Sequence, residues 1–208
     1  MSSYVAFLLA AVVLAFTPGP GIAYVVARTA AGGRAEGLAS CLGTAFGGLL
    51  HVLAAALGLS ALLVESALAF SIVKYVGAAY LVFLGTRLLL SRQAPTSQVP
   101  VVPGIGIRNA LRDGILVEAF NVKTALFFLA FLPQFIDPSR PAVLQLIAMG
   151  CVCVMLNTLV DVIAVLGTGR VLRSDVARKR RERLLAKSSG VTMIGLGLYV
   201  AVSRQGAD

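Results

Sequence analysis

The chain has 208 residues, of which 58% are hydrophobic and 13% are charged. A soluble domain is about half apolar and about one quarter charged, so this composition argues against a soluble protein. The formal net charge is +9, and the run Arg178–Arg183 suggests nucleic-acid binding at first sight. Because that run lies between two apolar segments, we expect a solvated loop that contacts at most anionic lipid, and no nucleic-acid partner.

The first apolar segment carries no charge from Tyr4 to Ala27, which exceeds the roughly 20 residues that a membrane span needs. No basic region precedes it, so we interpret it as a retained span rather than a cleaved signal peptide. The sequence "TPGP" at Thr17–Pro20 lies inside this segment. Proline lacks the backbone donor and clashes with the preceding turn, which costs about 3 kcal/mol in a helix interior. We therefore expect the first span to be interrupted there.

Five more apolar segments follow, which predicts an all-α integral membrane protein with six transmembrane helices. The expected spans are residues 3–27, 38–63, 67–89, 114–136, 142–168 and 188–203. The first, third and fifth connectors carry fourteen Lys and Arg residues, whereas the second and fourth carry one. Basic connectors stay in the cytoplasm. This alternation predicts a multi-pass protein of the cytoplasmic (inner) cell membrane with both termini outside.

A polar, proline-rich linker divides the chain into two groups of three spans. We expect one membrane transport domain over residues 1–208, with three-helix halves at 1–90 and 112–208 and a cytoplasmic linker at 91–111. An odd number of spans inserts the two halves in opposite directions, as in transporters built from inverted repeats. A faint echo, "AFTPGP" at Ala15–Pro20 and "AFNVKT" at Ala119–Thr124, places an unusual polar patch at the start of each half.

Ionisable residues inside membrane spans are costly, and each is therefore a candidate site residue. Asp161 and Asn157 are four residues apart in the fifth span and share one helix face. A carboxylate at that depth must pair, take up a proton or meet water. A static pair with Lys123 of the fourth span is the structural alternative to a functional Asp161.

The second span presents a stripe of small residues, Gly43 and Gly47, that continues to His51. Small residues at this spacing let two helices approach closely, so His51 should face protein. It is either a structural histidine bonded between helices or a substrate and proton site. Glu118 lies nearer the cytoplasmic edge, where we expect a solvated or loop-pairing role. Lys74 either extends outward to the interface or joins a site.

The interrupted first span predicts an anion site. Backbone groups that a break frees are tolerated in lipid only against protein or a watery cavity. A half-helix that begins after the prolines presents its positive N-terminal end at mid-depth, which favours a small carboxylate. Lys123 would add a positive charge nearby, while Asp161 or His51 would face an ammonium group or carry a proton. A proline kink used for packing is the alternative. The predicted substrate-binding residues are Thr17, Pro18, Gly19, Pro20, Gly21, Asn121, Lys123, Asn157 and Asp161.

These residues resemble the LysE/RhtB family of small amino-acid exporters. Besides "TPGP", the similar blocks are "KYVGAAYLVFLGTRLLL" at Lys74–Leu90 and "NVKTALFFLAFLPQF" at Asn121–Phe135. The Gly43, Gly47 and His51 stripe also fits. Val122 stands where the family pattern usually has proline, so we expect the fourth span to be free to continue unbroken.

The resemblance implies export of a small amino acid or amino-acid derivative, energised by the proton gradient. We expect alternating access around a midplane site, with Asp161 and His51 as coupling candidates. The alternatives are a transporter of another small solute or a metal ion, or a membrane assembly factor. We see neither a metalloprotease nor a serine-hydrolase motif, so we expect no enzyme, and we expect neither a cofactor nor a bound metal. The last span carries glycines that would serve a homodimer or internal packing, namely Gly190, Gly195 and Gly197.

Overall fold

The computed structural model describes residues 2–59, 67–90, 104–137, 139–171, 187, 190, 191, 193–195 and 197–202. This part of the chain is helical and contains no strand. Two of the elements, η1 and η2, are π-helical, and η3 is a 3₁₀ turn. The elements in chain order are α1 (Ser2–Phe16), α2 (Pro20–Ala54), η1 (Ala55–Leu59), α4 (Ala67–Leu90), α5 (Ile107–Ala119), α6 (Val122–Leu126), η2 (Phe127–Phe131), η3 (Leu132–Phe135) and α7 (Ala142–Val171).

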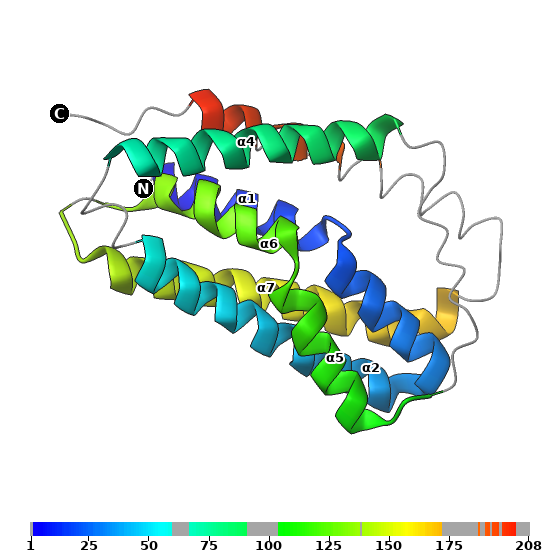
Figure 1. Ribbon diagram of the computed structural model, residues 1–208. Coiled ribbons are helices and arrows are strands. Elements are labelled where there is room, and N and C mark those ends of the chain that lie inside the picture. The colour runs from blue at the N-terminus through cyan, green and yellow to red at the C-terminus, as the bar shows by residue number, and fades with distance from the viewer. Residues whose placement is uncertain are drawn as a thin grey trace.

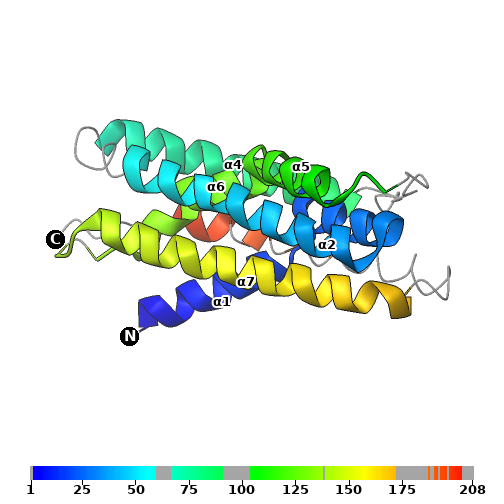
Figure 2. The same ribbon diagram turned by 90° about the horizontal axis from the view of Figure 1, so that it is seen from below.

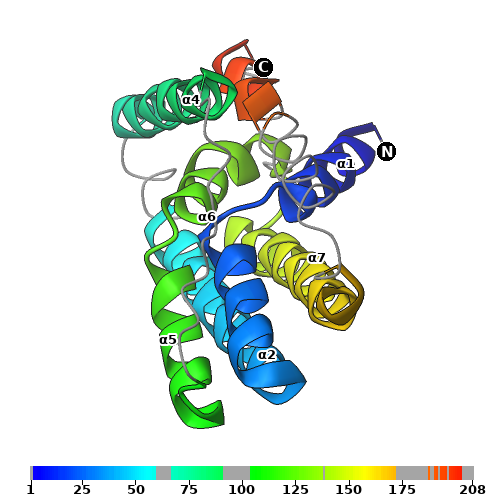
Figure 3. The same ribbon diagram turned by 90° about the vertical axis from the view of Figure 1, so that its right-hand side faces the viewer.

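The helices form an elongated bundle (Figure 1). α2 is not one straight rod, because the backbone leaves helical geometry at Gly33 (φ 78°, ψ −172°) and the chain reverses there. This reversal, the start of α5, and the ends of α4 and α7 all lie at the same end of the bundle (Figure 1). The view from below shows α7 and the returning part of α2 side by side (Figure 2). Seen end-on, α6 occupies the middle, with α1, α4, α7 and the α2–α5 pair around it (Figure 3).

The membrane-crossing capacity of these helices can be compared with the six predicted spans. Among the described residues, Pro20–Gly58 and Ala142–Thr168 are each long and apolar enough to cross a bilayer. The pair Ile107–Ala119 and Val122–Phe135, bent by 43°, adds a third span if it is counted as one. Tyr4–Phe16 and Met193–Val202 are shorter apolar helices. The six-span arrangement in two inverted halves therefore remains a prediction.

One helix boundary differs clearly from the predicted one. α5 begins at Ile107, inside the segment assigned to the linker and seven residues before the predicted fourth span. The reason is that this stretch is amphipathic: Ala110 and Gly114 are buried, whereas Arg108 and Arg112 are exposed. Residues 91–103 of the linker and residues 172–186 of the basic loop lie outside the described residues.

α2 and α5 pack so closely that their backbones are in direct contact. A Cβ atom built on Gly43 would meet the Leu111 carbonyl oxygen and lie 3.0 Å from the Gly114 Cα. A Cβ atom on Gly47 would lie 2.6 Å from the Ile115 carbonyl oxygen. The stripe of small residues noted in the sequence therefore faces a helix, where side chains larger than hydrogen would separate the two backbones.

The main apolar core lies where α1, the end of α2, η2, η3 and α7 meet. Phe127 and Phe131 stack with ring centroids 4.8 Å apart, and Phe131 and Phe135 lie 5.0 Å apart. The outside of the bundle is also apolar, with Leu9 and Leu57 among many large exposed hydrophobic residues. A surface of this kind is expected where lipid, rather than water, surrounds the helices.

The glycines of the last helix pack mainly inside the molecule. A Cβ atom on Gly190 would lie 2.7 Å from the Gly85 carbonyl oxygen, and one on Gly197 would lie 2.7 Å from the Ala78 carbonyl oxygen. Both contacts are with α4. Gly195 has open space around it. Two of these three glycines therefore serve internal packing.

Candidate functional site

The first helix break lies at Thr17–Gly19, between the end of α1 and the start of α2. Pro18 lacks an N–H group and Pro20 occupies the first position of α2, where a missing donor costs nothing. The Lys123 side chain crosses to this break. Its Nζ donates to the Thr17 carbonyl at 2.8 Å and reaches the Leu14 carbonyl at 3.5 Å. A buried cation therefore satisfies the Thr17 carbonyl, shares the Leu14 carbonyl with the Thr17 backbone N–H, and complements the negative end of the α1 dipole.

The second break lies at Phe120 and Asn121, between α5 and α6. Val122 in place of proline left open whether the fourth span continues unbroken, and the structure shows a break, since the two helical parts are bent by 43°. Asn121 caps the start of α6, since its Oδ1 accepts the Lys123 backbone N–H at 3.1 Å. Its Nδ2 donates to Glu118 Oε2 at 2.9 Å, and Thr124 Oγ1 donates to Glu118 Oε1 at 2.6 Å. The break is therefore held by side-chain hydrogen bonds on both sides of it.

A cavity of about 30 Å³ lies between the two breaks, which is room for about two water molecules. It is closed to a molecule the size of an amino acid in this conformation. The residues that line it come from α1, α2, α5, α6, α7 and the two breaks. They are Ala15, Thr17, Gly19, Gly21, Ile22, Thr44, Ala45, Gly48, Glu118, Asn121, Lys123, Thr124, Val154, Asn157, Thr158 and Asp161.

The charges around the cavity are two carboxylates and one ammonium group. Asp161 is buried, and its Oδ2 accepts from Thr44 Oγ1 at 2.9 Å. Glu118 is also buried, and both of its carboxylate oxygens accept hydrogen bonds. Lys123 is not ion-paired with Asp161, because its Nζ is turned to the α1 carbonyls. Asp161 thus keeps an oxygen available to the cavity, whereas Glu118 is committed to the second break.

Most of the predicted substrate-binding residues converge on this cavity. Pro18 and Pro20 do not line it, and neither does His51. His51 is half-buried on α2, where its Nε2 donates to the Glu118 carbonyl of α5 at 2.8 Å. Lys74 is buried in α4 and does not line the cavity. The predicted residues that do line it are Thr17, Gly19, Gly21, Asn121, Lys123, Asn157 and Asp161.

Sequence reasoning missed part of the cavity wall. The expectation that Glu118 lies at a solvated edge is wrong, because the bend at Asn121 turns it inward to Asn121 and Thr124. Its closeness to the start of α2 also explains Gly21, where a Cβ atom would lie 2.6 Å from Glu118 Oε2. The hydroxyls of Thr44 and Thr158 carried no signal, since threonines are common in apolar helices.

Comparison with known proteins gives one family and several bacterial relatives. The family model described as LysE type translocator matches residues 12–204. An uncharacterized membrane protein of Vibrio cholerae is 31% identical, with 97% of each chain covered. The homoserine/homoserine lactone efflux protein of Salmonella typhimurium is 28% identical, with 96% of each chain covered. The leucine efflux protein of Salmonella choleraesuis is 25% identical over 67% of this chain and 66% of its own length. No solved structure matches significantly.

Proposed function

The chain belongs to the LysE type translocator family, and on that premise we propose that it exports a small amino acid or amino-acid derivative across the cytoplasmic membrane. Relatives over nearly the full length include a homoserine/homoserine lactone efflux protein, and a shorter match is a leucine efflux protein. The observation that carries the proposal is the small cavity between the two helix breaks, whose wall carries groups of both charges. A zwitterion offers the complementary charges.

The proposed binding mode assigns one end of the cavity to each charge of the substrate. Gly21 and Ile22, at the positive N-terminal end of α2, face the cavity and would receive the carboxylate. Lys123 adds positive potential there, although its hydrogen bonds go to the α1 carbonyls. The substrate ammonium group would meet the available oxygen of Asp161, and Asn157 would add a hydrogen bond. Asn121 holds the second break in place.

Transport would follow by alternating access, with one three-helix half moving against the other around this cavity. Asp161 is the first candidate for proton coupling because it has one hydrogen-bonded and one available oxygen. His51 is the second, through the Glu118 carbonyl that it contacts. In this cycle the present conformation, whose cavity is too small for an amino acid, would be one with no substrate bound. The positive-inside rule would place the Gly33 turn on the cytoplasmic side.

The test is a panel of labelled amino acids in proteoliposomes, with and without an imposed pH gradient. Asp161→Asn and Lys123→Ala should lose most of the transport that wild type shows. Asp113→Asn is the matched control, because Asp113 is a carboxylate that pairs with Arg112 outside the cavity. If both cavity variants transport as well as wild type at equal protein density, this site assignment is wrong. If wild type moves no amino acid under either condition, the proposed substrate class is wrong.

A further inference from the structure

One segment of the cavity wall is bounded by helix breaks at both ends. We call Pro20–Gly32 the arm. It begins after the break at Thr17–Gly19 and ends at Gly33, whose positive φ is open to glycine and strained for other residues. Gly21 and Ile22, at the start of the arm, line the cavity. A rigid helical segment between two backbone breaks has the form of a hinged element, since hinges are a few residues at element ends.

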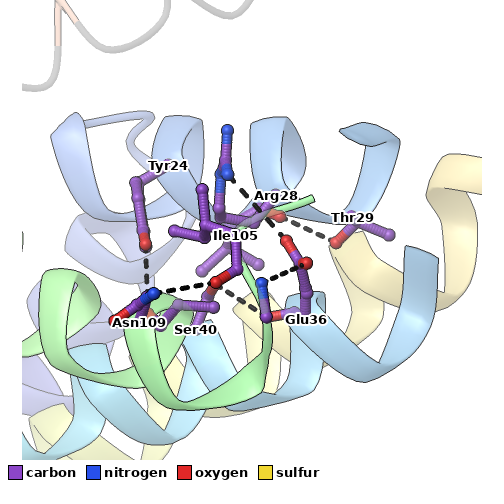
Figure 4. A network of polar contacts seen from close by, with 10 residues as sticks. Tyr24, Arg28, Thr29, Glu36, Ser40, Ile105 and Asn109 are labelled. Carbon is purple, nitrogen blue, oxygen red and sulfur yellow. Dashed lines mark hydrogen bonds and ion pairs between the residues drawn. The ribbon is translucent and has the colours of Figure 1, made fainter. Parts of the chain in front are cut away.

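The arm is held against the bundle by two polar ties near the Gly33 turn (Figure 4). Tyr24 Oη donates to the Ala110 carbonyl of α5 at 3.1 Å. Arg28 and Glu36 face each other across the turn, with 3.9 Å between the Arg28 Nη1 and Glu36 Oε2 atoms. We call these two contacts the latch.

The ion pair of the latch is incompletely bonded. Arg28 is 6% exposed and Glu36 is 5% exposed, yet Nη1 of the one and Oε2 of the other have no hydrogen-bond partner. The second Glu36 oxygen, Oε1, accepts the Gly106 backbone N–H at the start of α5 at 2.8 Å. A buried ion pair stabilises a fold only when its geometry and remaining hydrogen bonds are good. At 3.9 Å this pair is long and makes no hydrogen bond between its charged atoms, so we expect it to be a weak contact that can be broken.

The arm covers Cys41 through an apolar contact. Val25 of the arm is fully buried against Cys41 and Val165, which lie on the returning part of α2 and on α7. This small cluster is separate from the main core, which contains Cys153. Displacement of the arm would therefore uncover Cys41 and leave Cys153 covered.

We propose that the arm is the cytoplasmic gate of the cavity and that Arg28, Glu36 and Tyr24 latch it shut. The inference rests on the transport function proposed above. Breaking the latch lets the arm turn about Gly33 and Thr17–Gly19. This movement opens the cavity at Gly21 and Ile22 toward the end of the bundle at which α4 and α7 end. By contrast, the glycine-mediated contact of α2 with α5 stays closed and gives the arm a fixed surface to move against.

The test uses Cys41 as a reporter of arm position. Cys151 and Cys153 are replaced by Ala, and a membrane-impermeant maleimide is added to the cytoplasmic face of inside-out vesicles. Glu36→Gln removes a charged partner from both of its contacts, so labelling of Cys41 should become about ten times faster. Tyr24→Phe removes a neutral hydroxyl and its hydrogen bond to the Ala110 carbonyl, and should give an increase of about two- to fivefold. Asp113→Asn, a carboxylate change in the middle of α5 and in neither latch contact, should leave the rate unchanged.

A second reporter separates gating from general loosening. In a variant that keeps only Cys153, Glu36→Gln and Tyr24→Phe should not change the labelling rate, because Cys153 lies in the main core. Equal acceleration at both cysteines, or no acceleration at Cys41, overturns the gate. Should Glu36→Gln fail to accumulate, the Tyr24→Phe result decides alone. Labelling needs no substrate, so the gate can fail while export holds, and export can fail while the gate holds.

Discussion

The close contact of α2 with α5 makes Gly43→Ala the sharpest test of the fold. The added Cβ atom would meet the Leu111 carbonyl oxygen and lie 3.0 Å from both the Gly114 Cα and the Ile115 nitrogen. All three are backbone atoms, so relief requires the two helices to move apart. Overpacking of this kind costs about 1–3 kcal/mol, and the better helix propensity of alanine returns up to about 1 kcal/mol. We expect a net loss of about 1–2 kcal/mol.

The assay is thermal unfolding in detergent micelles, followed by the loss of helical circular dichroism. For a chain of this length, 1 kcal/mol corresponds to about 2–4 °C, so Gly43→Ala should melt about 2–8 °C below wild type. Gly167→Ala is the matched control, because Gly167 lies inside α7 and a Cβ atom there has open space. That variant should melt at or slightly above the wild-type temperature. If the two variants melt together, the backbone contact does not exist as described.

Three further variants probe the breaks and one loop. Lys123→Met leaves the Thr17 carbonyl without its charged donor and should lower stability by about 2 kcal/mol, measured by the same melting experiment. Gly33→Ala forces a side chain into a conformation open to glycine, at a cost of about 2 kcal/mol; an unchanged melting temperature would contradict the positive φ at this turn. Asp137 lies outside the spans, and its pKa is below its ordinary value because the Ser139 hydroxyl and backbone N–H both donate to it. A lowered carboxyl pKa stabilises the fold above the unfolded-state pKa, and this stabilisation is lost as the pH falls through the folded-state pKa, so Asp137→Ala should destabilise at neutral pH and not in strong acid.

The first helix break could be predicted from the sequence, whereas the second could not. Pro18 and Pro20 interrupt a helix through their own covalent structure, which is local information. At the second break the residue that replaces proline is Val122, which is compatible with a helix. The cause of that bend is tertiary: the Asn121 cap and the Glu118 carboxylate that accepts from it. A single sequence does not show which partner a capping side chain will find.

The candidate site was predictable to the extent that it uses charged residues. Asp161 and Lys123 stand out in an apolar chain because burying a charge is costly. Their partners were not predictable, since Lys123 binds main-chain carbonyls and Asp161 binds the Thr44 hydroxyl. Neutral and small residues such as Gly48 look the same in a cavity wall as in ordinary packing. A straight fourth helix would put Glu118 near the cytoplasmic edge, and the bend after it is what brings it to the cavity.

The anchorage of Lys123 at the end of α1 constrains how the cavity can be redesigned. Lys123 binds main-chain oxygens and so helps to hold the helices together. Replacing it to fit a different substrate would therefore destabilise the cavity wall. Thr158 and Val154 also line the cavity, but they belong to the uninterrupted α7 and hold neither helix break in place. Attempts to retune which solute fits should therefore start on that helix, where shape can change while the framework stays intact.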